Sequence, residues 1–288
     1  MNLLFEKITF CFDPLHHLWE HEKLHKKISL FLVLLFLAML LAIELKRLGL
    51  VSGSLGYYIP QSHFSAIQMA FTVVLILEVI SLIFTLPCSF SQSVGKQFEL
   101  LALILLRNAF KELSYFPEPI SFAGNEEAIL RIVTDGFGAL VIFALLGVYY
   151  LIQDKKPPEE KMAATDLYSF VASKKGIALL LLGAFAYMGL RSVWLTASGV
   201  EHTDFLHDFY TLLILTDVLV VLISQCFQPG FYAVFRNSGF ALSTMIIRIA
   251  LAAPPFYNVL LGIAAALFAI LLTIVSQRLF KSKQFQSH

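Results

Sequence analysis

Residues 28–45 read ISLFLVLLFLAMLLAIEL, an apolar run interrupted by one serine and one glutamate. A helix needs roughly 20 mostly apolar residues to cross the hydrocarbon core of a bilayer. Further segments of this kind lie at 64–87, 94–115, 129–152, 176–197, 206–227, 233–252 and 256–279. The segments 94–115 and 233–252 carry internal charged or polar residues, and without them the count drops to six. The sequence therefore predicts an all-α integral membrane protein with about eight transmembrane helices.

The composition points to the same class of protein. The chain has 288 residues, 58% of them hydrophobic and 14% charged, and a mean hydropathy of +0.77. Soluble domains carry about 25% charged residues. The formal net charge of +1 gives no reason to expect a nucleic-acid partner. The expected partners are the lipid bilayer and either other membrane subunits or a second copy of the chain.

Basic residues collect on one side of the predicted bundle. With eight spans, the N-terminal segment, the 153–175 loop and the C-terminal tail share a side, and all are rich in Lys or Arg. The opposite loops hold acids such as Glu126 and Glu201, and Lys46 with Arg47 is the exception. Cytoplasmic loops carry the excess of Lys and Arg. We therefore expect both termini in the cytoplasm and the protein in a plasma (inner) membrane.

The long 153–175 loop divides the chain into two halves of four spans. The predicted organisation, in chain order, is an N-terminal interfacial segment 1–27, a first four-helix repeat 28–152, a cytoplasmic linker 153–175, a second four-helix repeat 176–279 and a cytoplasmic tail 280–288.

The two halves resemble each other in sequence. The overlay matches these pairs: His63 with His202, Thr72 with Thr211, Glu78 with Asp217, Val79 with Val218, and Arg107 with Arg248. Asp135 and Asn258 also take similar places in the last span of each half. Because each half has an even number of spans, the copies form a parallel repeat, as some transporters do. The alternative is chance, since apolar helices align easily.

Four charged residues are predicted to lie at mid-membrane. Glu78 and Arg107 fall near the middle of consecutive antiparallel spans, and Asp217 and Arg248 repeat this arrangement. A charge at the bilayer centre costs several kcal/mol and persists when it is paired or faces the bundle interior. Two interpretations stay open. The pairs either fix helix register alone, or they line or gate a route for a small ion or polar solute.

Secondary candidates lie on the third and fourth spans. Lys96, Glu99, Leu103, Arg107 and Lys111 are spaced by three or four residues, which puts them on one helix face. This stripe favours a polar interior, with Lys96, Glu99 and also Asp135 as further site candidates. The alternative is that Arg107 alone is deep, while Lys96 and Lys111 reach the two membrane interfaces.

Two groups of histidines could bind cations. Residues 199–209, GVEHTDFLHDF, place His202 and His207 among acids on the outer side, although a solvated helix start explains them equally. His17, His21 and His25 follow each other at the i, i+4 spacing of shared metal ligands. Their neighbouring tryptophan, leucines and lysines favour an interfacial anchor instead. The sequence leaves metal binding open.

No motif assigns a cofactor or a reaction. The sequence contains no CxxCH and no Gly-rich phosphate loop, and its one match to HExxH, residues 21–25 (HEKLH), lies in the segment interpreted above as an interfacial anchor. Three functions stay open. The favoured one is a transporter or channel-like protein for a small ion or polar solute. The others are a non-catalytic membrane subunit or assembly partner of a larger complex, and a membrane enzyme that acts on lipid or quinone through the outer histidines and acids.

Overall fold

The structure is a computed structural model and describes residues 2–50, 59–60, 62–116, 121–153, 164–198 and 205–279, where it contains helices and no strand. The α-helices are α1 Asn2–Glu20, α2 Glu22–Arg47, α4 Phe64–Thr85, α5 Phe90–Lys111, α6 Glu126–Ile152, α7 Ala164–Ala197, α8 Phe205–Phe227, α9 Phe231–Ala252 and α10 Tyr257–Ile274. A short 3₁₀ helix, Glu112–Tyr115, follows α5, and a π-helical turn, Val275–Leu279, follows α10.

Six of the described helices are long and apolar enough to cross a membrane, namely α2, α4, α6, α7, α8 and α10. Helices α5 and α9 have the same 22-residue length as α4 but carry charged residues along it. Each nevertheless packs into the bundle against several other helices, although α5 also keeps an exposed face. Helix α5 contacts α4, α6 and α9, and helix α9 contacts α8 and α10. The two weakest predicted segments are therefore central helices.

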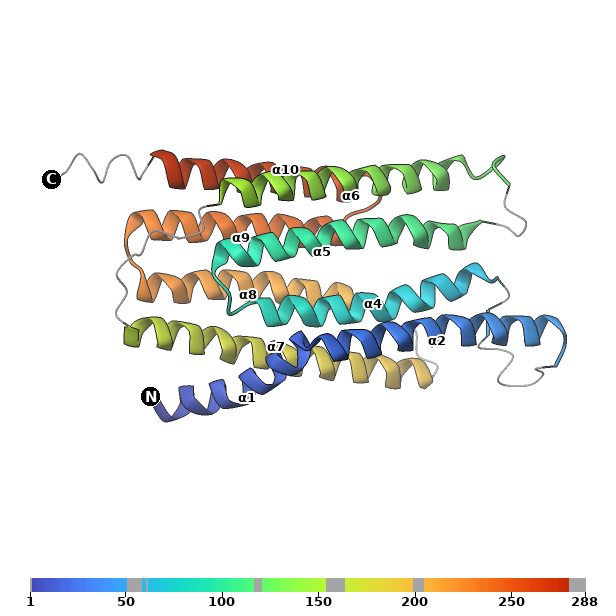
Figure 1. The fold of residues 1–288 in the computed structure, drawn as a ribbon, viewed down its shortest axis with the longest axis horizontal. Coiled ribbons are helices and arrows are strands. Elements are labelled where there is room, and N and C mark those ends of the chain that lie inside the picture. The colour runs from blue at the N-terminus through green and yellow to red at the C-terminus, as the bar shows by residue number, and fades with distance from the viewer. Residues whose placement is uncertain are drawn as a thin grey trace.

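The helices run lengthwise beside one another (Figure 1). Helices α6 and α10 lie at one level of this view, α5 and α9 at the next, and α4 and α8 below them. Direct contacts join α6 to α10 and α5 to α9. Helices with the same place in the two halves thus share a level, while α1 begins and α10 ends towards the same end of the bundle.

The hydrophobic core forms two clusters, and each combines both halves of the chain. One cluster packs α5 and α6 against α9 and α10, through residues such as Leu101, Ile142 and Ile247. The other packs α4 against α7 and α8, through residues such as Ile83 and Phe209. The halves are therefore not two separate bundles, because each half completes its core with helices from the other.

Two glycines allow α6 and α10 to approach closely. A Cβ atom added to Gly138 would lie 2.5 Å from a methyl carbon of Val259, and one added to Gly262 would lie 2.8 Å from Ile142. Small residues at such crossings let helix backbones approach and pack in membrane proteins. These contacts hold the fourth helix of one half against the fourth helix of the other.

Helices cover the N-terminal segment and the second part of the predicted linker. Helix α7 begins at Ala164, inside the predicted 153–175 linker, and helix α1 packs against it. Phe12 of α1 is buried, and Asp13 forms an ion pair of 2.6 Å with Lys175 of α7. Helix α7 can continue beyond the predicted span because α1 covers part of this extension.

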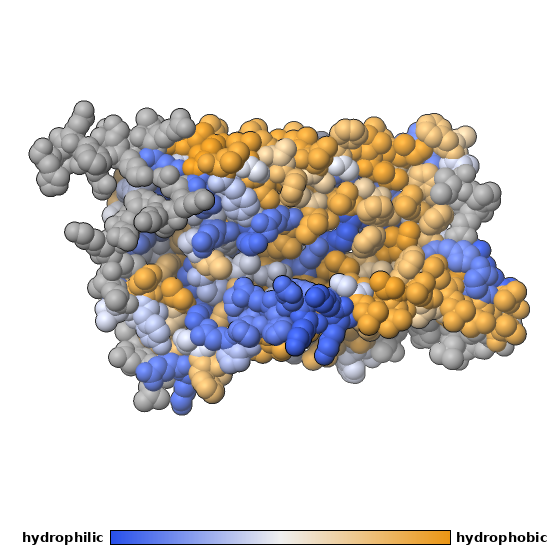
Figure 2. All heavy atoms as spheres, viewed as in Figure 1, coloured by the Kyte–Doolittle hydropathy of each residue, from blue (hydrophilic) through white to orange (hydrophobic). Residues whose placement is uncertain are grey.

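The face of the bundle seen in Figure 2 is largely apolar along the helices. Leu34, Leu180 and Leu271 are between 57% and 76% exposed and belong to three different long helices. Hydrophilic residues gather over the junction of α1 and α2. Contiguous apolar surface of this extent marks contact with a membrane or with partner proteins.

Candidate functional site

Glu78 on α4 and Arg107 on α5 form the predicted ion pair. The Arg107 Nη2 group donates a hydrogen bond to Oε2 of Glu78, and Nη1 donates to the backbone carbonyl of Phe71 at 3.3 Å. The side chains are 11% and 13% exposed. The antiparallel packing of α4 on α5 brings them together, because each lies near the middle of its helix.

Asp217 on α8 and Arg248 on α9 form the second predicted pair. Nη2 of Arg248 lies 2.9 Å from Oδ1 of Asp217, and the side chains are 2% and 9% exposed. The hydroxyl of Thr244, one turn before Arg248 on α9, lies 2.8 Å from both Oδ2 of Asp217 and the carbonyl oxygen of Ala241, and the charged carboxylate is the stronger acceptor for its one hydrogen. Both carboxylate oxygens of this pair therefore accept a hydrogen bond or an ionic contact.

Tyr210 on α8 lies within electrostatic range of both pairs. It is buried, and its hydroxyl is close enough to act electrostatically on the guanidinium groups of both Arg107 and Arg248. Tyr210 precedes Asp217 by about two helical turns, so both lie on one face of α8. The four predicted charges thus belong to one buried polar region between α4–α5 and α8–α9.

A small cavity of about 20 Å³ lies beside Asp217. This is room for about one water molecule. Its lining residues are Leu86, Cys88, Phe90, Ser93, Lys174, Asp217, Val220, Ala241 and Thr244. The cavity therefore extends from the second ion pair towards the turn that joins α4 to α5.

The other charged residues of α5 do not line the interior. Lys96 is 55% exposed and forms an ion pair of 2.8 Å with Glu99. Glu99 also accepts a hydrogen bond of 2.7 Å from the hydroxyl of Tyr150 on α6. Leu103, between Glu99 and Arg107, is 51% exposed. The predicted polar stripe is thus mostly a surface feature, and Arg107 is its buried member.

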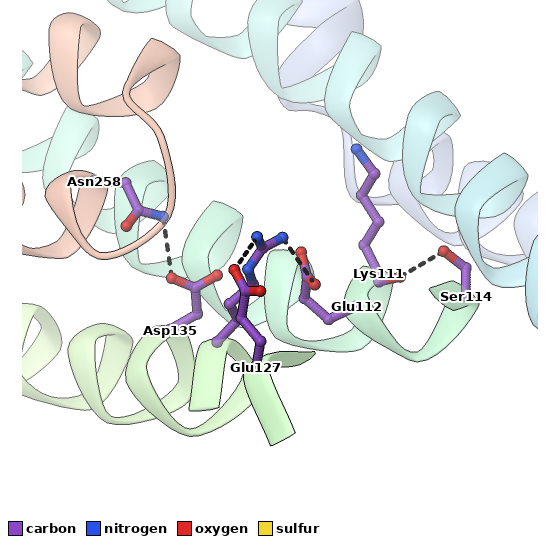
Figure 3. A network of polar contacts seen from close by, with 7 residues as sticks. Lys111, Glu112, Ser114, Glu127, Asp135 and Asn258 are labelled. Atoms are coloured by element: carbon purple, nitrogen blue, oxygen red, sulfur yellow. Dashed lines mark hydrogen bonds and ion pairs between the residues drawn. The ribbon is translucent and has the colours of Figure 1, made fainter. Parts of the chain in front are cut away.

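Asp135 lies in a separate polar network (Figure 3). Its Oδ1 atom accepts a hydrogen bond of 3.0 Å from Nδ2 of Asn258, and both residues are buried. Arg131, one turn before Asp135 on α6, contacts Glu127 at 2.6 Å and Glu112 at 3.6 Å. Asp135 and Asn258, which take similar places in the two halves, therefore meet across the contact between α6 and α10.

The candidate histidine sites are only partly described. His202 lies outside the described residues, and the side chain of His207 is likewise not described. His17 and His21 form a ring contact on the N-terminal helices. Among the described residues, no group of three or more His, Cys, Asp or Glu side chains could hold a metal ion. His63, matched to His202 in sequence, pairs with Glu44 at 2.8 Å.

Sequence reasoning missed three residues of the polar region. Tyr210 could have been found from its two-turn spacing before Asp217 on a predicted helix. Lys174 was assigned to the linker, whereas it is 2% exposed and lines the cavity. The backbone carbonyl of Phe71 carries no side-chain signal in a sequence.

Comparison with protein-family models, curated proteins and solved structures finds no match to this chain.

Proposed function

We propose that this chain is an integral membrane transporter or channel-like protein that moves a small ion or polar solute between its two four-helix halves. The observation that carries the proposal is the buried polar region, in which two ion pairs and Tyr210 lie where α4–α5 and α8–α9 meet. A purely apolar core would pack helices without the desolvation cost of four charges. Such charges in membrane helices mark ion and substrate pathways.

The proposal includes α5 and α9 as membrane spans. Each has 22 residues, which at 1.5 Å per residue is about 33 Å and matches a hydrocarbon core of about 30 Å. Their deep arginines are compensated within the bundle, because Arg107 and Arg248 pair with carboxylates on neighbouring helices. Eight spans also put both termini on one side, which we propose is the cytoplasmic side of a plasma (inner) membrane.

The proposal also includes an internal duplication. Three observations support it: matched helices share a level of the bundle, α5 and α6 contact α9 and α10, and an arginine–carboxylate pair forms at the matched places of each half. In transporters built from repeats, the substrate site lies at the repeat interface. The buried polar region lies where α4–α5 and α8–α9 meet, which would be the interface between the two proposed repeats.

The proposal can be tested by liposome swelling. The purified chain is reconstituted and swelling rates are measured in iso-osmotic KCl, glycine and glucose. We expect at least one solute to enter faster than into empty liposomes. The double variant Asp217→Ala, Arg248→Ala should abolish this entry, since it removes both charges without leaving either unpaired. The matched control Leu103→Ala, at an exposed site on α5, should keep it. Equal swelling with and without the protein for all three solutes contradicts transport.

One observation favours a second function, that of a membrane subunit in a larger complex. Among the described residues of α2, Ile43 alone is buried. No residue of this helix belongs to either of the two hydrophobic core clusters. A partner subunit could cover this helix in place of lipid. The test is size-exclusion chromatography with light scattering of the chain purified alone in detergent. A single defined species supports the transporter, whereas aggregation that a co-purified subunit prevents supports the subunit.

A further inference from the structure

We propose that the cavity between Lys174, Ser93 and Asp217 is a binding site for a small monovalent anion such as chloride. This inference rests on the proposed function and names the substrate class and the site on the route. It depends on the hydrogen bonding of Lys174, on the charge around the cavity and on the size of the cavity.

Lys174 is a buried cation whose donors are only partly used. Its side chain is almost fully buried, and Nζ donates hydrogen bonds to the backbone carbonyls of Pro87 and Cys88. The ammonium group also lies over the rings of Phe90 and Phe170, at 5.1 and 5.2 Å from their centroids. An ammonium group has three donors. Within the described part of the chain, two backbone carbonyls are its hydrogen-bond acceptors and no carboxylate pairs with it, so its positive charge has no anionic partner there.

The charges around the cavity add up to a positive value. Lys174 and Asp217 are the charged residues that line the cavity, and Asp217 is neutralised by its ion pair with Arg248 outside the lining, which leaves the positive charge of Lys174 uncompensated. Burial raises the pKa of the Cys88 thiol, which lines the cavity, so this thiol stays neutral. A buried charge is costly unless it is compensated. An anion in the cavity would compensate Lys174.

Asp217 lines the same cavity and would repel an anion, but its charge is locally satisfied. Arg248 contacts Oδ1 at 2.9 Å and Thr244 donates to Oδ2 at 2.8 Å. Ser93, on the first turn of α5, is a further lining residue with a hydroxyl group. The available donors are therefore the ammonium group of Lys174 and the hydroxyl of Ser93.

The volume limits the occupant to a monatomic ion or a water molecule. About 20 Å³ holds about one water-sized particle. Carboxylates and phosphates have several heavy atoms and do not fit this space. A positive site of this size therefore fits a halide.

The test is chloride binding to the full-length chain, purified in detergent and chloride-free gluconate buffer. Sodium chloride is titrated against sodium gluconate while heat release and Tm are recorded. We expect saturable binding and a chloride-dependent rise in Tm. Lys174→Met should weaken binding roughly tenfold or more, because it removes a hydrogen bond from a charged group. The matched control Lys175→Met, which changes the neighbour that pairs with Asp13, should bind like the unmodified chain.

A second variant covers the case in which Lys174→Met fails to fold. Ser93→Ala keeps the charge and should weaken chloride binding roughly two- to tenfold, the usual cost of a neutral hydrogen bond. Unchanged binding in both variants, or no saturable binding to the unmodified chain, overturns the site. Chloride binding without solute entry into liposomes would support the anion site and contradict the proposed transport. Entry of another solute without chloride binding would support transport and contradict the anion site.

Discussion

The two ion pairs use the same chemistry but differ in how completely the protein surrounds them. The side chains of Arg107 and Glu78 are 11% and 13% exposed, while those of Arg248 and Asp217 are 2% and 9% exposed. The additional hydrogen bonds also differ. In the first pair a backbone carbonyl supports the arginine, and in the second a threonine hydroxyl supports the carboxylate.

This difference determines which single substitution is most damaging. A carboxylate that loses its partner can become neutral by binding a proton, whereas arginine stays charged in proteins. Nε and Nη1 of Arg248 have no hydrogen-bond partner among the described residues, so Asp217 is its main support. Arg107 would still keep the carbonyl of Phe71 after losing Glu78.

The largest loss of stability is therefore expected for Asp217→Ala. It leaves a fully enclosed guanidinium unpaired, and breaking a buried pair in this way costs about 3–5 kcal/mol. The free energy of unfolding in mixed micelles measures the effect. The double variant Asp217→Ala, Arg248→Ala should lose less than the single one, and a larger loss in the double variant would show that Arg248 does not depend on Asp217.

A smaller loss is expected for Glu78→Ala. Arg107 keeps one hydrogen bond and some access to the surface, so the expected cost is about 1.5–3 kcal/mol, that of a hydrogen bond to a charged group. The same unfolding measurement applies. Equal losses for Glu78→Ala and Asp217→Ala would remove the distinction between the two pairs.

A double-mutant cycle tests the pairing itself in the first half. Arg107→Ala should destabilise the protein more than Arg107→Ala combined with Glu78→Ala, because the single change leaves a carboxylate in the bundle without its cation. Losses that simply add in this cycle would contradict the pairing of these two residues.

The Thr244 hydroxyl distinguishes the second pair from the first. Thr244→Val removes the donor to Asp217 and keeps the side-chain shape, so we expect a loss of about 1–3 kcal/mol from the unsatisfied carboxylate. Leu103 takes the matching place on α5 and is 51% exposed, so Leu103→Val should change stability by about 0.5 kcal/mol or less. Comparable losses at both positions would mean that the Thr244 hydroxyl contributes nothing specific.

The sequence predicted helix positions and the charged contacts well, for a physical reason. Long apolar runs report burial in lipid, and two charges at similar depths on consecutive antiparallel helices can only be tolerated together. The pairing of Arg107 with Glu78 and of Arg248 with Asp217 followed from depth alone. The eight spans and the duplication stay predictions.

Packing between distant segments could not be predicted in the same way. Lys174 lies in a charged stretch that resembles a solvated linker, and only the turn between α4 and α5, some 85 residues earlier in the chain, makes it a buried residue. On α5, helix spacing put Lys96 and Leu103 on the face of Arg107 and left open whether Arg107 alone is deep. Both are more than half exposed, because helix spacing identifies a face but not what covers it.

The smallest change in stability is expected for the exposed ion pair of α5, which lies on the same helix as the buried Arg107. Lys96 and Glu99 are 55% and 35% exposed, and pairs of this kind contribute about 0–1 kcal/mol. Lys96→Gln should therefore leave the free energy of unfolding nearly unchanged, and added salt should reduce the difference further, because exposed charges are screened. Arg107→Ala, about three turns further along α5, serves as the comparison under the same conditions. Both changes remove one cation from the same helix. An equal loss of stability for Lys96→Gln and Arg107→Ala would show that burial of the ion pair does not determine its contribution to stability.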